Sequence, residues 1–279
     1  MDTLLTKKDA IKLIGLDSKT FDNYFRNADE FTSQKRINGK GRFLFSKSLL
    51  DKWLTSYEWR TIELTYDDYV LCLDFALAQH FRGYVLSDWG TARQREFGQK
   101  ITNWIKGQLA EVAVKKFFKR EFNADIELDF GIHKNIVPQD IISVSINGSK
   151  RLPRVGIGIK ASKPKSSYLV LGENEIIISE RRSDYYIFCR PDIPDDHLLR
   201  LTKEKITKIV SQQPHFDKYK DDIPSFENIF CEISGWCGVD ELERVTSIPG
   251  QDFTGVRYVK KSGHLHKNKS DWQRLIDKL

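Results

Sequence analysis

One segment limits the possible folds of this chain more than any other: residues 107–122, GQLAEVAVKKFFKREF. Its apolar residues recur at helical spacing in two neighbouring stripes: Leu109, Ala113 and Phe117, and beside them Ala110, Val114 and Phe118. A helix that is apolar over so wide an arc must be buried on most of its surface. Strand-like segments follow at 125–130, 141–146 and 154–162. This order predicts a mixed α/β (α+β) fold, in which helices flank a mixed sheet.

The composition is that of a globular protein and excludes several other classes. Of the 279 residues, 40% are hydrophobic and 30% are charged, which excludes a disordered chain. The sequence has no run of 18 apolar residues, and its start, MDTLLTKKDA, lacks the apolar core of a signal peptide. We therefore expect a cytoplasmic protein with no membrane association. The cysteines, Cys72, Cys189, Cys231 and Cys237, include no CxxC pair, so we expect reduced thiols and no zinc site.

The positive charge is concentrated at the two ends of the chain. The net charge is +6. Residues 1–60 hold 12 Lys and Arg against 8 Asp and Glu, and residues 255–279 hold 7 against 2. Two basic ends suit a polyanionic partner such as a nucleic acid, although a basic tail can also be no more than a solvated surface.

Residues 5–54 predict three short helices and a hairpin. Thr6 precedes the first helix, and Gly15 marks its end. A second helix, SKTFDNYFRNA, begins near Ser18, and two short helices joined by a Gly-containing turn are typical of a helix-turn-helix. In the next segment, RINGKGRFLF, Asn38-Gly39 predicts a β-turn between two strands, which indicates a wing. A third helix, KSLLDKWL, follows.

This segment resembles the winged helix-turn-helix domains of the MerR and excisionase families. The matching residues are Leu5-Thr6, Ala10, Ile14-Gly15, Arg42, Phe43, Leu50, Trp53 and Leu54. The resemblance implies that the second helix and the wing contact double-stranded DNA. The implied DNA-binding residues are Ser18, Lys19, Asn23 and Arg26 on the helix, and Lys35, Arg36, Lys40 and Arg42 around the hairpin. The same fold can also serve as a protein-docking module, so that alternative stays open.

A glutamate, an aspartate and a lysine follow one another through the predicted core. Glu111 lies on the buried helix, outside both apolar stripes. Asp140 begins the strand 141–146, and Lys160 lies near the end of the strand 154–162. Asn147-Gly148 predicts a turn that joins these two strands as a hairpin. Considered alone, Glu111 predicts an exposed ion pair with the residue one helical turn later, and Lys160 predicts only a charged residue at the end of a strand.

This order resembles the PD-(D/E)XK nuclease superfamily, which includes most type II restriction endonucleases. Pro138-Gln139-Asp140 matches the PD element, and Gly158-Ile159-Lys160 matches the (D/E)XK element, except that Gly158 stands where the family has a second acidic residue. Matches to a strand–helix–strand of relatives follow at Asn174, Glu175, Asp184 and Tyr186. The resemblance covers about residues 105–190 and implies a restriction-endonuclease-like core. Either Glu111 supplies the missing carboxylate, or the domain is a degenerate, inactive relative. The neighbouring Asp125, Glu127 and Asp129 are further candidates for that carboxylate.

The implied chemistry is Mg²⁺-dependent hydrolysis of DNA phosphodiester bonds, with Mn²⁺ as a substitute. Mg²⁺ prefers carboxylate, carbonyl and water oxygens, so the resemblance makes Asp140, Glu111 and the backbone carbonyl of Ile159 its ligands. A bound metal polarises the phosphate and lowers the pKa of its water. Lys160 positions or deprotonates the nucleophile and stabilises charge on the phosphate. Glu111, Asp140 and Lys160 are thus the expected catalytic residues.

The C-terminal region supplies further candidates for contact with DNA. Restriction enzymes often place specificity loops late in the chain, which makes Lys260, Lys261, His264, His266, Lys267 and Lys269 candidates for contact with DNA. Lys163, shortly after Lys160, is a further expected DNA-binding residue. The expected organisation is a winged helix-turn-helix domain at 1–56, a helical linker at 57–104 and a nuclease domain at 105–279. Palindromic DNA sites favour a homodimer.

The leading hypothesis is a sequence-specific endodeoxyribonuclease of a prokaryotic restriction system. Two alternatives remain at this stage. The first is a non-catalytic DNA-binding regulator with a degenerate nuclease fold, which Gly158 favours. The second is a nuclease of repair, recombination or transposition that has the same site but recognises DNA structure.

Overall fold

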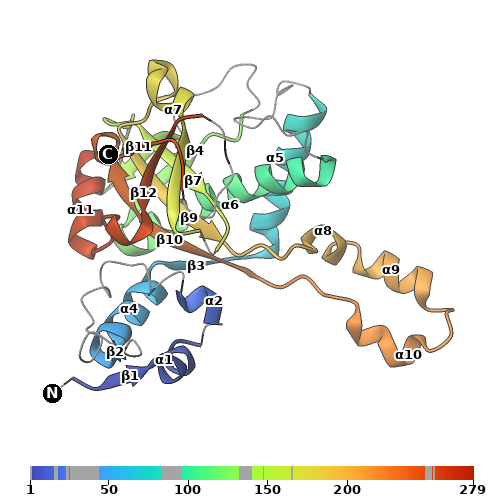
Figure 1. The fold of residues 1–279 in the computed structure, drawn as a ribbon. Helices are drawn as coiled ribbons and strands as arrows, with labels where there is room; N and C mark the ends of the chain where they lie inside the picture. The colour runs from blue at the N-terminus through green and yellow to red at the C-terminus, as the bar shows by residue number, and fades with distance from the viewer. Residues whose placement is uncertain are drawn as a thin grey trace.

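A computed structural model describes residues 2–15, 18–22, 25, 44–82, 96–131, 140–146, 148–164, 166–248, 253 and 255–279. Helices and mixed sheets alternate along this part of the chain, which confirms a mixed α/β fold (Figure 1). No helix among the described residues is long and apolar enough to cross a membrane. Of the expected wing and second helix, residues 23–24 and 26–43 lie outside the described residues, and with them lie Asn23, Arg26, Lys35, Arg36, Lys40 and Arg42.

The N-terminal segment has a small hydrophobic core of its own. Its elements are β1 (Leu4–Thr6), α1 (Lys7–Ile14), α2 (Ser18–Phe21), β2 (Leu44–Ser46) and α4 (Lys47–Trp59), and β1 pairs antiparallel with β2. As expected, Thr6 caps α1 by accepting a hydrogen bond from the backbone N–H of Asp9, and Gly15 ends the helix at a φ of 73°. Phe21, Phe25 and Leu50 are buried in the core between these elements.

A four-stranded mixed sheet forms the centre of the molecule. Its order is β3 (Thr61–Leu64), β10 (Ile229–Gly238), β9 (Tyr185–Pro191) and β7 (Ile157–Ala161). β10 runs antiparallel to both of its neighbours, whereas β7 runs parallel to β9. Because successive residues of a strand point to opposite faces, β9 contributes Ile187 and Cys189 to the core on one face and Tyr186 and Phe188 to a second core on the other.

Helix α6 (Phe97–Phe122) is buried against this sheet, as its two apolar stripes predict. Leu109, Ala113, Phe117 and their neighbours in the second stripe are all fully buried. The helix ends at Asn123, which adopts the left-handed conformation at φ 49°. Helix α5 (Tyr66–Phe81) packs beside α6. The two helices cover the same hydrophobic core as Ile157, Ile159 and Ile187 of the sheet.

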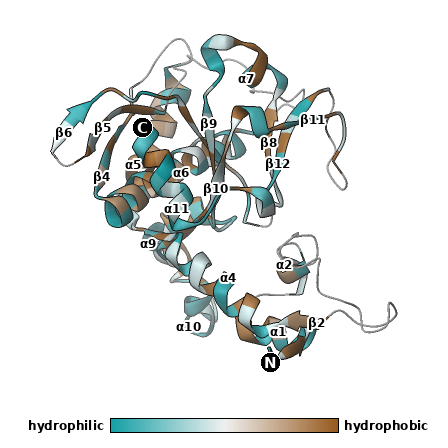
Figure 2. Ribbon diagram, turned by 90° about the vertical axis from the view of Figure 1, so that its left-hand side faces the viewer, coloured by the Kyte–Doolittle hydropathy of each residue, from teal (hydrophilic) through white to brown (hydrophobic). Residues whose placement is uncertain are grey.

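Two three-stranded sheets and several helices complete the structure. One sheet has the order β4 (Ala124–Leu128), β5 (Ile141–Ile146), β6 (Ser149–Arg151) and lies next to α5 and α6 (Figure 2). The other has the order β11 (Glu243–Val245), β12 (Arg257–Lys261), β8 (Tyr168–Gly172). The remaining α-helices are α7 (Glu173–Ile177), α8 (His197–Arg200), α9 (Lys203–Val210), α10 (Phe216–Tyr219) and α11 (Lys269–Lys278). Figure 1 shows α8, α9 and α10 in an arm that extends away from the central sheet.

Two expectations differ from the structure. The segment 57–104, expected to be a helical linker, contains strand β3, which pairs with β10 in the central sheet. The expected hairpin is also wrong in its second strand. Residues 146 and 149 do pair across the turn, but that strand is the short β6, and β7 pairs with β9 instead of β5. Pro153, which has no backbone N–H, lies between β6 and β7, where the ladder ends.

Candidate active site

Asp140 connects two strands that belong to different sheets. It stands directly before β5, and its carboxylate Oδ2 accepts a hydrogen bond of 2.6 Å from the backbone N–H of Ile159 on β7. The N–H and C=O of one strand residue point toward the same edge, so the Ile159 carbonyl also faces the side of Asp140 rather than β9. The sequence motif therefore brings Asp140 and Ile159 together as expected, although 18 residues lie between them.

Lys160 lies next to Ile159 and meets a carboxylate that the sequence did not single out as catalytic. Its Nζ is 3.2 Å from Oε2 of Glu175, which α7 carries over the end of β7. Both side chains are part-exposed, at 35% for Lys160 and 38% for Glu175, although the Oε2 atom of Glu175 is itself shielded from solvent. In the sequence, Glu175 matched the Asn-Glu pair of a strand–helix–strand segment. That match predicted secondary structure and gave Glu175 no catalytic role.

Glu111 lies beneath these groups and is shielded from solvent. It is 7% exposed, and its Oε1 accepts a hydrogen bond of 2.9 Å from the side-chain amide of Gln108. Burial raises the pKa of the Glu111 carboxyl well above its usual range, and the negative charge of Asp140 raises it further, while Lys160 acts in the opposite direction. The structure thus brings all three expected catalytic residues into one electrostatic neighbourhood.

The charges in this neighbourhood act on one another in opposite senses. Burial raises the pKa of Asp140, although Lys160 and the N–H of Ile159 oppose that rise. For Lys160, burial alone lowers the pKa, but the carboxylates of Glu175 and Asp140 outweigh it and leave the pKa above its ordinary value. Lys160 is therefore a cation at neutral pH. Its pairing with Glu175 and Asp140 makes it unsuited to act as a free base in this arrangement.

Gly158 shares a face of β7 with Lys160, and a larger residue there requires its neighbours to move. A Cβ built at this position would lie 3.0 Å from Oγ of Ser183 and 3.0 Å from two ring carbons of Tyr186, closer than side chains ordinarily pack. Tyr186 is itself buried, and its hydroxyl accepts a hydrogen bond of 3.0 Å from the backbone N–H of Ser183. The ring of Tyr186 thus occupies the space that an acidic side chain at position 158 would need.

The expected DNA-binding residues are distributed unequally over the surface. Ser18 is exposed on α2, and Lys19 lies on the same helix. Lys163, Lys261 and His264 are exposed in the C-terminal two-thirds of the chain, and Lys267 is half-buried.

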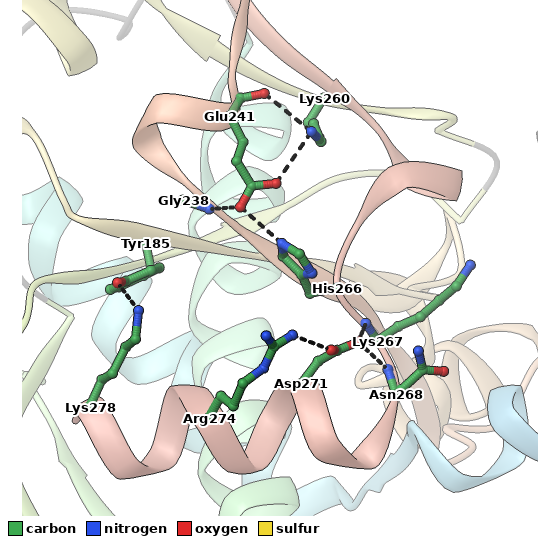
Figure 3. A network of polar contacts seen from close by, with 10 residues as sticks. All are labelled: Tyr185, Gly238, Glu241, Lys260, His266, Lys267, Asn268, Asp271, Arg274 and Lys278. Carbon is green, nitrogen blue, oxygen red and sulfur yellow. Dashed lines mark hydrogen bonds and ion pairs between the residues drawn. The ribbon is translucent and has the colours of Figure 1, made fainter.

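Lys260 differs from the expectation of a free basic side chain. Its side chain is 15% exposed, and its Nζ lies 3.3 Å from both the backbone carbonyl and the carboxylate Oε2 of Glu241. The same carboxylate binds His266 through an N–O contact of 2.9 Å, so Glu241 ties β12 to the segment that precedes α11 (Figure 3). Lys260 therefore has a structural role in this network.

The described residues contain no group of three or more His, Cys, Asp or Glu side chains arranged to hold a metal ion. Mg²⁺ needs only one or two protein carboxylates, because it keeps several waters and binds substrate phosphate. Asp140 and Glu175, whose charges both act on Lys160, are a donor set of that size. Comparison of the chain with protein-family models, with curated proteins and with solved structures finds no match.

Proposed function

We propose that this protein is a Mg²⁺-dependent endodeoxyribonuclease of the PD-(D/E)XK type, with Asp140, Glu175 and Lys160 at its active site. One observation carries the proposal: Asp140 bonds to the backbone directly before Lys160, and Lys160 pairs with a second carboxylate from α7. Three residues that are far apart in the sequence converge on one end of β7. Asp140 and Lys160 were expected from motif order alone, without any knowledge of the fold.

The order of elements supports a restriction-endonuclease-like core. A long helix, α6, is followed by the antiparallel strands β4, β5 and β6, then by β7, β8, the short helix α7 and β9, which runs parallel to β7. Asp140 stands directly before β5, and Lys160 lies in β7. This order of a long helix, an Asp before a strand, a Lys in a later strand and a helix before β9 is in keeping with the resemblance, whereas the expected hairpin between β5 and β7 does not form.

Each residue has a task that its surroundings allow. Asp140 and Glu175 would hold the metal, helped by the Ile159 carbonyl that faces the same side. When bound, Mg²⁺ supplies Lewis-acid activation of the phosphate and of the attacking water. Lys160 would contact the phosphate as a cation, orienting it and stabilising the charge that develops during the reaction. The shielded Glu111, whose carboxyl has a raised pKa, would serve this site indirectly.

The target of this chemistry is proposed to be double-stranded DNA. The N-terminal segment has the helix caps and the separate core that a winged helix-turn-helix unit needs, and this supports DNA binding by residues 1–56. Cutting both strands at a palindromic site favours a homodimer, because two-fold symmetry then presents one site to each strand. A restriction enzyme of the cytoplasm is the form of this proposal that we favour.

The test uses purified full-length chain, plasmid DNA of varied sequence and Mg²⁺. Wild type should convert supercoiled plasmid to discrete fragments, and Asp140→Ala, Lys160→Ala and Glu175→Gln should each cut at least ~100-fold more slowly, a usual cost of losing charge stabilisation. Asp125→Ala is a matched control, because Asp125 is a part-exposed carboxylate on β4 that pairs with Lys119 at 3.7 Å. Full activity of Asp140→Ala, or no cutting by wild type on any substrate, refutes the proposal.

A non-catalytic DNA-binding regulator is the second candidate, and Gly158 favours it. Such a protein binds duplex DNA equally well in EDTA and in Mg²⁺ and nicks nothing. The plasmid assay, together with a gel-shift measurement in both conditions, separates the two candidates.

A further inference from the structure

A basic groove lies between α4 and the start of α11, outside the candidate active site. Its volume is about 380 Å³. The residues that matter most in its lining are Lys52, Ser56 and Trp59 from α4 and Lys267 and Lys269 from the C-terminal side. The groove therefore joins the basic N-terminal segment to the basic C-terminal segment.

Contacts with the core hold the α4 side of the groove in place. The ring of Trp59 packs on Phe117 of α6 at 5.3 Å between centroids, and its indole N–H donates a hydrogen bond to the carboxylate of Glu121. The guanidinium of Arg120 donates to the backbone carbonyl of Trp59. The end of α4 is thus fixed to α6 by both its side chain and its backbone.

The α11 side is held by a helix cap. The Asp271 carboxylate accepts hydrogen bonds from the backbone N–H of Lys267 at 3.2 Å and of Asn268 at 3.0 Å (Figure 3). The Lys267 side chain extends away from Asp271 in that view. A fixed backbone on both sides gives the lysines a defined separation before any ligand arrives, which lowers the entropy cost of binding.

The charge of the groove is of one sign. Three lysines line it, and none of its described lining residues is acidic. The nearest carboxylates in the fixed walls are already engaged, Glu121 by Arg120 at 2.6 Å and Asp271 by Arg274 at 2.6 Å. Burial lowers the pKa of Lys267 to about 8, because its ammonium group loses water on entering the groove. An anion in the groove would offset that loss.

We propose that this groove binds a backbone phosphate of DNA, away from the bond that is cut, so that α4 and α11 grip the duplex together. Lysines, hydroxyls and amides make most phosphate contacts in protein–DNA complexes, and all three kinds line this groove. DNA is favoured over a free nucleotide because α4 is the last helix of the segment expected to lie on the duplex. The identity of the ligand rests on the proposed function, whereas its anionic character rests on the groove alone.

The test measures how DNA affinity depends on salt. The full-length chain is titrated against a fluorescein-labelled duplex in EDTA, at several KCl concentrations, and anisotropy gives log K against log[KCl]. Each phosphate contact contributes about 0.9 to the slope. Lys52→Ala/Lys269→Ala should reduce the slope by about 0.9–1.8 and weaken binding about tenfold near 0.1 M salt. Both residues are exposed, so folding is preserved.

The control is Lys205→Ala/Lys208→Ala, which removes the same charge from exposed positions on α9. Equal slopes for the control and the groove variant overturn the inference and leave the nuclease proposal untouched. If the groove variant shows the expected decrease in slope relative to wild type, but wild type does not cut plasmid, the nuclease proposal is refuted and phosphate binding in the groove is supported. Binding of millimolar AMP or inorganic phosphate that depends on Lys52 and Lys269, together with a duplex affinity that Lys52→Ala/Lys269→Ala leaves unchanged, overturns DNA as the occupant.

Discussion

Restoring the acidic residue that the superfamily has at position 158 should harm this protein. In Gly158→Ala the added Cβ meets Ser183 Oγ and two carbons of the Tyr186 ring, each at 3.0 Å. The ring is 1% exposed and cannot move into solvent, so the substitution overpacks the core at a cost of about 1–3 kcal/mol. Gly158→Asp adds a desolvated carboxylate to that cost and should exceed 3 kcal/mol. Because the Tyr186 hydroxyl also lies 3.5 Å from the Glu175 backbone carbonyl, a displaced ring disturbs Glu175 and slows cleavage.

Urea unfolding of the full-length chain measures the loss of stability, and the plasmid assay measures cleavage. The matched control is Gly107→Ala in α6, where nothing lies within 4 Å of the added Cβ. Glycine in a helix interior costs about 0.5–1 kcal/mol relative to alanine, so this variant should be more stable than wild type. A Gly158→Ala variant as stable as wild type, or a Gly158→Asp variant that cuts faster, would show that the reasoning about Tyr186 is wrong.

Two further predictions concern buried polar groups away from the candidate active site. His197 is 2% exposed with both ring nitrogens bonded to hydroxyls, and burial first, then the charge of Lys106, hold its pKa below 6.5. The stabilising contribution of neutral His197 is therefore complete above pH 6.5 and is lost as the pH falls through the lower folded-state pKa. The urea midpoint of wild type should drop between pH 7.5 and 5.5. The midpoint of His197→Gln should drop less over the same range. Glu232→Gln should cost about 3–5 kcal/mol in urea unfolding, because the buried Glu232 pairs with Arg60 at 3.4 Å and Arg190 at 2.9 Å; a cost below ~1 kcal/mol would contradict this.

Local patterns in the sequence predict the local parts of this fold well. The two apolar stripes predict α6 because a buried helix repeats its pattern over several turns. Thr6 and Gly15 predict the ends of α1 because capping depends on neighbouring residues alone. Each of these features involves contacts within a few residues along the chain.

Strand pairing could not be predicted in the same way. The four residues of β3 lie between two helices and pair with Ile229–Glu232 of β10, more than 160 residues away. The turn at Asn147-Gly148 suggested a local partner for β7, but its partner is β9, a parallel strand that follows β8 and α7. Neither pairing can be recognised from a short stretch of sequence, because the partner of a strand is selected by the burial of side chains on both faces of the central sheet.

Glu111 and Glu175 show why the residues of the candidate active site could not all be predicted from the sequence. From the sequence, Glu111 was the first candidate for the acid missing at Gly158, with Asp125, Glu127 and Asp129 as further candidates and an inactive domain as the alternative. In the structure Glu111 lies on α6, which covers the face of β7 that carries Ile157 and Ile159. Gly158 and Lys160 share the opposite face, and there Glu175 reaches Lys160 from α7. A carboxylate that replaces the family acid has to reach that face, and Glu175 does so through its contact with Lys160, whereas Glu111 is shielded and its pKa is raised by burial. If the proposed function holds, Glu175 would therefore stand in for the family acid, and Glu111 would act on the site only indirectly.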